Sequence, residues 1–179
     1  DALRARISKD TYGMFNQAST VLGGIFVPGE VIFVTHEPAG QALGATPDGR
    51  KAHTVLADSM GAAQGMDMKG PTALLRSVVQ VPARDYLLTP PVLNLRFASS
   101  LWENKTSQLK IRTLFQEFFS LGGMQLQINV CNANVLRAAV REPENYRSLI
   151  VRVGGYSDYF VNLSPILQQE ILSRTEQVV

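Results

Sequence analysis

Residues 149–160 read Leu149-Ile150-Val151-Arg152-Val153-Gly154-Gly155-Tyr156-Ser157-Asp158-Tyr159-Phe160. The first five residues are mostly apolar and include three β-branched side chains, which predicts a short strand over 149–153. The pair Gly154-Gly155 ends this strand at once, because paired glycines favour tight turns. On the dipeptide alone, a structural turn is the simplest interpretation. The meaning of these glycines therefore depends on the sequence around them.

The rest of the chain alternates between helical and strand patterns. Alternating apolar residues and short apolar runs predict further strands over 31–34, 92–97 and 124–130. Helical spacing and capping signals predict helices over 3–22, 109–121, from Asn132 or Asn134 to Arg141, and from Ser164-Pro165 to about Thr175. This order is typical of an α/β fold. Four strands are too few for a closed barrel, so we expect an open sheet edge and an apolar face that other protein covers.

A long stretch, residues 38–72, is rich in glycine and proline and predicts irregular structure. An irregular stretch of this length in a compact domain is usually functional or packed on a partner. His36 and Glu37 stand just before it, at the end of the strand predicted over 31–34. Acid–base chemistry is one interpretation of this pair, and hydrogen bonding within a loop is the simpler one. His53 is expected at the surface.

Composition limits the classes of function. The 179 residues are enough for one domain, and 45% of them are hydrophobic, so a core can form. The net charge is +2 and Lys and Arg are not clustered, which argues against a nucleic-acid partner. Charged residues make up only 18%, below the usual share of about 25%, which again suggests that much of the surface faces other protein.

Cys131 is the only cysteine, which excludes an intramolecular disulfide framework and a cysteine-rich zinc site, and no metal site is expected. The most apolar stretch, residues 21–34, contains Pro28-Gly29-Glu30 and is too short to span a bilayer, so no membrane partner is expected. The chain opens on Asp1, with neither an initiating Met nor the apolar region of a signal peptide. We expect that first residues are missing or that the chain starts within something larger.

Several motifs, in a fixed order, resemble the glycyl radical enzymes, the family of pyruvate formate-lyase and its dehydratase and decarboxylase relatives. The first is Arg152-Val153-Gly154-Gly155-Tyr156-Ser157, which is similar to the family signature of Arg-Val, a small residue, Gly and an aromatic residue. The others are Gly44 to Lys51, Leu56-Ala57-Asp58-Ser59, Gly70-Pro71-Thr72-Ala73, Gly122-Gly123 with Gln127, Asn129 and Val130, Pro143-Glu144 with Tyr146, and Arg174-Thr175. Together they span about residues 30 to 176. The tail after Gly155 looks closer to the dehydratase, decarboxylase and eliminase branch.

The resemblance implies that Gly155 stores a radical. Glycine suits this role because a radical at a peptide Cα is stabilised by planarity, and glycine has no β-carbon to hinder it. In this family, an activating enzyme with an iron–sulfur cluster and S-adenosylmethionine abstracts the hydrogen, so no cofactor is bound by the chain itself. The glycyl radical then takes a hydrogen from a cysteine on a facing loop, and the thiyl radical attacks a small-molecule substrate. The family fold is a ten-stranded α/β barrel of two five-stranded halves.

By the same resemblance, the chain is one C-terminal glycyl radical domain, with a barrel segment over 1–120 and the radical-loop region over 121–179. Loop support is expected from the residues that flank the radical position, which are Arg152, Val153, Gly154, Tyr156 and Ser157. Packing against the loop, or lining of the cavity, is expected from Gln125, Gln127 and Asn129 on one face of the strand over 124–130, and from Leu93 and Asn94.

The family's catalytic cysteine lies well before the motif over residues 44–51, and no cysteine occurs there. Cys131 is interpreted as a small buried hydrophobe. Three alternatives follow: a small subunit whose large subunit carries the cysteine, a spare part that repairs an oxygen-cleaved relative, or a fragment of a longer chain. Each predicts a hetero-oligomer or a missing N-terminal portion, no turnover alone, lyase-type chemistry, anaerobic metabolism and a cytoplasmic location.

Overall fold

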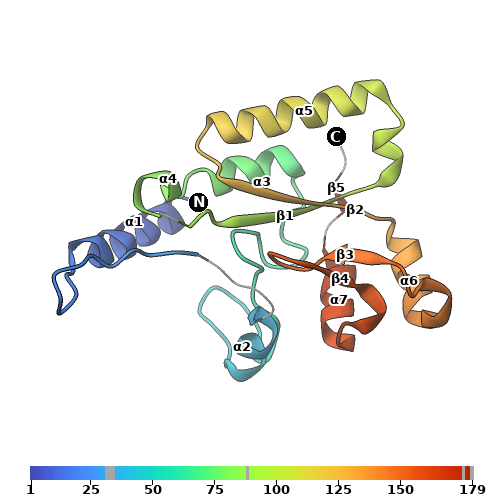
Figure 1. The fold of residues 1–179 in the computed structure, drawn as a ribbon, viewed down its shortest axis with the longest axis horizontal. Helices are drawn as coiled ribbons and strands as arrows, with labels where there is room; N and C mark the ends of the chain where they lie inside the picture. The colour runs from blue at the N-terminus through green and yellow to red at the C-terminus, as the bar shows by residue number, and fades with distance from the viewer. Residues whose placement is uncertain (31–34, 88, 175, 178–179) are drawn as a thin grey trace.

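The computed structural model describes residues 1–30, 35–87, 89–174 and 176–177. Its elements form a mixed α/β fold (Figure 1). The helices are α1 (Ala2–Gln17), α2 (His36–Ala42), α3 (Pro71–Val78), α4 (Ala83–Tyr86), α5 (Lys105–Ser120), α6 (Ala133–Arg141) and α7 (Pro165–Ser173), with 3₁₀ turns η1 (Ser99–Trp102), η2 (Pro143–Tyr146) and η3 (Phe160–Asn162). The strands are β1 (Val92–Phe97), β2 (Gln125–Val130), β3 (Ile150–Arg152), β4 (Ser157–Tyr159) and β5 (Glu176–Gln177).

The central sheet is parallel, in the order β2-β1-β5. β1 pairs with β2 in a register that runs from Val92 opposite Gln125 to Phe97 opposite Val130. Helix α5 connects these two strands, as parallel pairing requires a long crossover. β5 adds one short pairing at the end of β1, where Arg96 lies opposite Glu176. Among the described residues, no strand pairs with the outer edge of β2.

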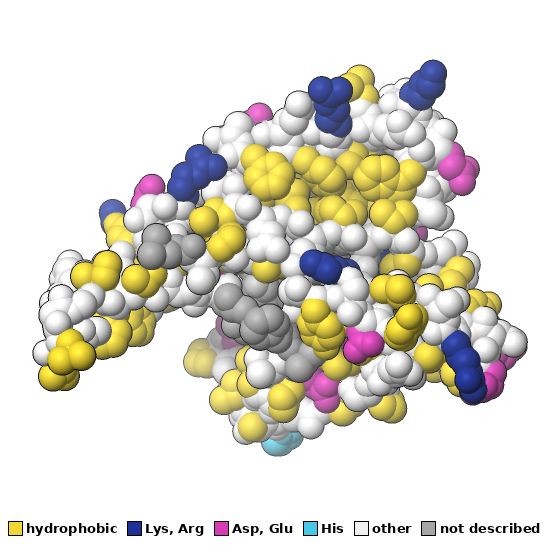
Figure 2. Space-filling view, in the orientation of Figure 1, with side chains coloured by type: hydrophobic (Ala, Val, Ile, Leu, Met, Phe, Trp, Pro, Cys, Tyr) yellow, Lys and Arg dark blue, Asp and Glu magenta, His cyan; other side chains and the backbone are white. Residues whose placement is uncertain are grey.

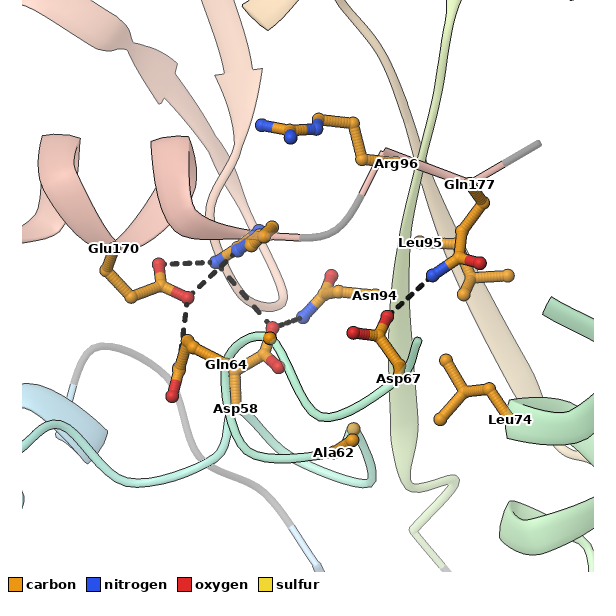
Figure 3. Close-up of a pocket in the computed structure, with 13 residues that line it drawn as sticks. Asp58, Ala62, Gln64, Asp67, Leu74, Asn94, Leu95, Arg96, Glu170 and Gln177 are labelled. Carbon is orange, nitrogen blue, oxygen red and sulfur yellow. Dashed lines mark hydrogen bonds and ion pairs between the residues drawn. The ribbon is translucent and has the colours of Figure 1, made fainter. Parts of the chain in front are cut away.

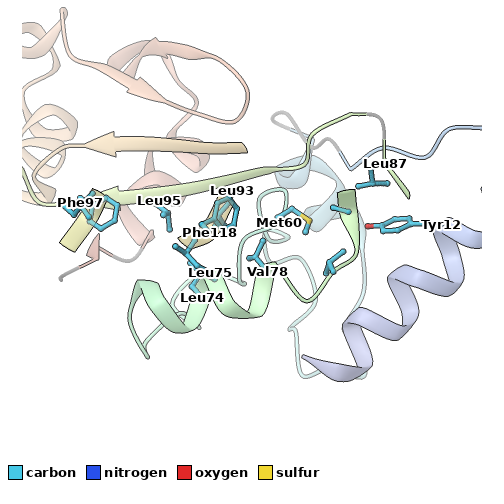
Figure 4. Close-up of a cluster of buried hydrophobic side chains, with 13 residues drawn as sticks. Tyr12, Met60, Leu74, Leu75, Val78, Leu87, Leu93, Leu95, Phe97 and Phe118 are labelled. Carbon is cyan, nitrogen blue, oxygen red and sulfur yellow. The ribbon is translucent and has the colours of Figure 1, made fainter. Parts of the chain in front are cut away.

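Two hydrophobic cores lie on opposite sides of the sheet. The first packs β1 and the inward side of β2 against α3 and α5, with Leu93, Phe97 and Phe118 at its centre (Figure 4). The second lies below the sheet in Figure 1 and joins α6, β3, η3 and α7. Its fully buried members include Leu136, Val153 and Phe160. The second core therefore holds the β3–β4 hairpin, which carries Gly154-Gly155.

Most elements expected from the sequence are confirmed. The strands over 92–97 and 124–130 are β1 and β2, and the strand over 149–153 is the slightly shorter β3. The helix after Asn132 is α6, with the Asn132 side chain accepting from the N–H of Asn134. The closing helix is α7, capped by Ser164, whose hydroxyl accepts from the N–H of Leu167. The predicted strand over 31–34 lies outside the described residues.

Some boundaries differ from the predictions for local reasons. Helix α5 begins four residues earlier than expected, because the Asn104 side chain caps it by accepting from the N–H groups of Thr106 and Ser107. The helix predicted over 3–22 ends at Gln17, where Ala18 turns to extended backbone, and Thr20 then forms a separate turn with Gly24. The predicted helix is confirmed as α1, but its predicted C-terminal end was wrong, because the apolar spacing continues beyond the helix.

Candidate functional site

Gly155 lies at the tip of the β3–β4 hairpin. The two strands pair from Ile150 opposite Tyr159 to Arg152 opposite Ser157, and the N–H of Val153 donates to the carbonyl of Tyr156 at 2.9 Å. This closes a turn whose two central residues are the glycines. Gly155 has a φ of 84°, in the left-handed region that favours glycine. Gly154 is buried, whereas Gly155 is exposed at the surface of the chain.

Two amide side chains of β2 bind the backbone of this hairpin. Asn129 pairs with Arg152 twice, because its Oδ1 accepts from the Arg152 N–H at 2.7 Å and its Nδ2 donates to the Arg152 carbonyl at 2.8 Å. Gln127 Oε1 accepts from the N–H of Gly155 at 3.1 Å. Both amides are nearly buried, at 5% exposure for Gln127 and 7% for Asn129. The amide face of β2 therefore positions the glycine turn through main-chain hydrogen bonds.

A third side chain reaches the same hairpin from the end of α7. Arg174 donates from Nη1 to the carbonyl of Arg152 at 3.0 Å and from Nη2 to the carbonyl of Val153 at 2.7 Å. In the sequence, Arg174 is recognisable only as part of a chain-end motif, and this contact was not predicted. Four backbone groups over residues 152–155 are thus bound by side chains of β2 and of the residue that follows α7.

Arg174 belongs to a buried ionic cluster at the pocket shown in Figure 3. Its Nε and Nη2 each lie 3.0 Å from a carboxylate oxygen of Glu170, and Nη2 lies 3.6 Å from Oδ2 of Asp58. His36 Nε2 lies 3.9 Å from Glu170 Oε2. His36 is fully buried at the start of α2, and the strand expected before it lies outside the described residues.

Burial and neighbouring charges shift the pKa values of the cluster residues in different directions. Burial opposes ionisation of Glu170, but the neighbouring His36 and the charge of Arg174 outweigh it and lower the pKa of Glu170 to about 2. Burial would also lower the pKa of Arg174, yet the carboxylates of Glu170 and Asp58 raise it. For Asp58, burial is the stronger influence and raises the pKa despite Arg174 nearby. Arg174 and Glu170 thus form the stable ion pair of the cluster.

The remaining predicted residues have varied positions. Asn94 points to the ionic cluster, since its Nδ2 donates to Asp58 Oδ2 at 2.7 Å, whereas Leu93 faces the first core (Figures 3 and 4). Arg152 Nη1 donates to the Ser157 hydroxyl across the hairpin at 3.0 Å. Tyr156 packs against the second core, and burial raises the pKa of its hydroxyl. Gln125 is half-buried and, among the described residues, makes no side-chain hydrogen bond to the hairpin.

Cys131 directly follows β2 and packs against the second core. Its burial raises the pKa of the thiol, so its environment does not favour a thiolate. Within the described ranges, no group of three or more His, Cys, Asp or Glu side chains is arranged to hold a metal ion. None of the described helices has the length and apolar character needed to cross a membrane.

The N-terminal part of the chain exposes many apolar side chains. Helix α1 and the segment after it project from the rest of the fold (Figure 1), and hydrophobic side chains are visible along this projection (Figure 2). The exposed large side chains there include Met14, Phe15, Val21, Leu22, Ile25, Phe26 and Val27. Clustered exposed apolar residues mark surfaces that contact other protein.

Comparisons with known proteins agree on one group. The family model described as glycine radical matches residues 56–161. An isethionate sulfite-lyase from Nitratidesulfovibrio vulgaris is 40% identical over 148 residues, which cover 81% of this chain and 18% of that protein. A trans-4-hydroxy-L-proline dehydratase from Clostridioides difficile is 35% identical and is matched over 99% of this chain and 22% of its own length.

Solved structures agree with these sequence matches. A Roseburia inulinivorans protein studied for 1,2-propanediol dehydration superposes with a TM-score of 0.92 at 33% identity, over 98% of this chain and 22% of that chain. The B12-independent glycerol dehydratase from Clostridium butyricum gives a TM-score of 0.91 at 32% identity, with the same coverage. The chain therefore spans about a fifth of the length of the relatives it matches.

Proposed function

Since this chain belongs to the glycyl radical enzyme family, in its dehydratase and lyase branch, we propose that Gly155 is the residue that stores the radical. The expected fold class is confirmed, because the mixed α/β chain superposes on solved members of that family, consistent with the C-terminal part of their barrel. The observation that carries the proposal is the position of Gly155 at the tip of a hairpin. The side chains of Gln127, Asn129 and Arg174 bind the backbone of this hairpin.

The chemistry follows from this position. An activating enzyme with S-adenosylmethionine and an iron–sulfur cluster removes one Cα hydrogen from Gly155, which leaves a radical delocalised over the two flanking amides. Delocalisation requires a planar centre, and the side chains that hold the neighbouring peptide groups favour one fixed backbone geometry. The supporting roles of Arg152, Val153, Gly154, Tyr156 and Ser157 in this loop are part of the same proposal.

Turnover requires a catalytic cysteine, and we do not assign this role to Cys131, the one cysteine of this chain. In the proposed reaction, the Gly155 radical takes a hydrogen atom from that cysteine, and the thiyl radical then abstracts hydrogen from a small substrate. Cys131 is a poor candidate because it packs against the second core. We assign the cysteine to a large subunit or an N-terminal portion. Three observations support a protein partner: the exposed apolar side chains of α1 and the segment after it, the edge of β2 with which no described strand pairs, and the exposed Gly155.

The reaction class is radical elimination or cleavage of a small molecule. The relatives named for sulfite-lyase, dehydratase and indoleacetate decarboxylase activities support dehydration, decarboxylation or cleavage of a C–C or C–X bond. We place this chemistry in the cytoplasm of an anaerobic cell. A repair subunit remains the second candidate, and similarity over nearly the whole chain, including residues before the loop, favours a barrel-forming part over a minimal repair module.

Electron paramagnetic resonance tests the proposal. The protein, with any larger partner, is incubated without oxygen with an activating enzyme, S-adenosylmethionine and a reductant. A doublet from the remaining Cα hydrogen is expected, and it should collapse when the glycine is α-deuterated. Gly155→Ala should abolish the signal. Gly44→Ala is the matched control, because a β-carbon there meets open space. A doublet that persists in Gly155→Ala contradicts the assignment.

Exposure to air gives a second readout. Oxygen should cleave the activated backbone at Gly155, and mass spectrometry of the denatured protein should detect the two pieces. An intact activated chain after air exposure would argue against a radical at this position.

A further inference from the structure

We infer that Arg174 is a positioning residue for the radical hairpin, and that its buried carboxylate partners Asp58 and Glu170 orient it for that task. This inference rests on the proposed role of Gly155 and deepens it. It assigns a task to a residue that follows α7 and to a turn, Leu56 to Ser59, that the proposed chemistry does not otherwise use.

The guanidinium of Arg174 donates hydrogen bonds to two kinds of acceptor, backbone carbonyls and a carboxylate. Toward the hairpin, Nη1 and Nη2 donate to the carbonyls of Arg152 and Val153, at 3.0 and 2.7 Å. Toward the cluster, Nε and Nη2 donate to the two oxygens of Glu170, both at 3.0 Å. A planar fork with five donors can serve both sides at once, which a single ammonium group cannot do.

The carboxylates are well placed to hold this orientation. Only 10% of the Arg174 side chain is exposed. The side chains of Glu170 and Asp58 are also largely buried, with exposures of 1% and 11%. Water therefore competes weakly with these ion pairs, and charge-assisted hydrogen bonds are strong under such conditions. The ion pair with Glu170 lies one helical turn away on α7, so the helix itself fixes one side of the fork.

Side chains of other segments hold the turn around Asp58 in place. Asn94 of β1 donates to Asp58 Oδ2, and Gln64 Nε2 lies 3.4 Å from Glu170 Oε1 while also donating to the carbonyl of Leu56 at 3.1 Å. Ser59 adopts a positive φ of 50°, a conformation that non-glycine residues rarely take. The irregular segment 56–64 is thus fixed against the cluster, and through Arg174 it is connected to the backbone next to Gly155.

Hydrogen exchange of the intact protein, followed by mass spectrometry, tests the inference. In Arg174→Gln, amide exchange over residues 152–156 should become about 10- to 100-fold faster, as expected when charge-assisted hydrogen bonds are lost. Exchange in β1 and β2 should stay at the parent rate. Arg174→Lys keeps the charge without the fork and should give an intermediate rate. The lysine variant also serves if the glutamine variant does not fold.

Arg50→Gln is the matched control, because Arg50 also donates to loop carbonyls, those of Gly44, Lys51 and Thr54. It should loosen residues 44–54 and leave 152–156 unchanged. Radical yield is the second readout: Arg174→Gln should lower the doublet per protein, Arg174→Lys should restore part of it, and Arg50→Gln should retain it.

The inference is overturned if residues 152–156 exchange at the parent rate in Arg174→Gln, or if exchange rises evenly throughout the chain. Failure of the proposed function has a different signature. A parent protein that gives no doublet with a competent activating enzyme, or a doublet that survives in Gly155→Ala, rejects the role of Gly155 but leaves the exchange result intact.

Discussion

Replacing Asn129 by alanine should weaken the attachment of the hairpin to β2. The Asn129 side chain makes two short hydrogen bonds to Arg152, one to its N–H and one to its carbonyl. After the substitution, Arg174 still binds the carbonyl, but the sheltered Arg152 N–H loses its acceptor. The lost bond to the Arg152 carbonyl contributes about 1 kcal/mol, and leaving the sheltered Arg152 N–H without an acceptor costs about 1–3 kcal/mol. The free energy of unfolding should therefore fall by about 2–4 kcal/mol.

Urea unfolding of the intact protein measures this loss, and hydrogen exchange locates it. The exchange of the Arg152 amide should be the most accelerated. Gln125→Ala is the matched control, because Gln125 lies on the same face of β2 but makes no described hydrogen bond to the hairpin, and it should cost less than about 0.5 kcal/mol. A change below about 0.5 kcal/mol for Asn129→Ala, with unaltered exchange at Arg152, would refute the reasoning.

Three further predictions concern the cluster, the turn and the core. The pKa of Glu170 is lowered to about 2 from an ordinary 4.5, so its stabilising charge is present above pH 4.5 and is lost as the pH falls toward 2; in Glu170→Gln, urea unfolding between these pH values should show a weaker loss of stability than in the parent. Gly155→Ala should cost about 1–2 kcal/mol in thermal or urea unfolding because of the positive φ, whereas an unchanged midpoint would show that the turn relaxes freely. Phe118→Ala should cost about 3–5 kcal/mol by the same measurement, since its ring is buried at the centre of the first core, and a loss below 1 kcal/mol would mean that this core is loosely packed.

The sequence was sufficient where local chemistry determines structure. The strict alternation of residues 124–130 predicted both β2 and its amide face, and Asn132 and Ser164 predicted the starts of α6 and α7. Short strands were missed because their formation depends on contacts between distant segments. β4 and β5 have three and two residues, and each exists because a partner strand is in place.

Arg174 shows the same limit within the candidate site. Its contacts join residues 58, 152–153 and 170, and no periodicity or spacing relates these segments. His36 was singled out from the sequence together with Glu37, but the carboxylate close to its ring belongs to the distant Glu170. The sequence offered only weak signals for this cluster. The motifs around Asp58 and at Arg174 resemble those of the family, but the resemblance implied no role for either residue. A long-range ionic cluster becomes visible only in the folded chain.

The groups that bind the hairpin contact only its main chain. Gln127, Asn129 and Arg174 bind the N–H of Gly155, both backbone groups of Arg152 and the carbonyl of Val153. Every peptide unit offers an N–H or a carbonyl group of this kind. These hydrogen bonds therefore do not depend on which side chains the loop carries. Exposed positions such as Tyr159 could thus be exchanged by an engineer to suit a different partner surface, while the same main-chain hydrogen bonds continue to hold the glycine.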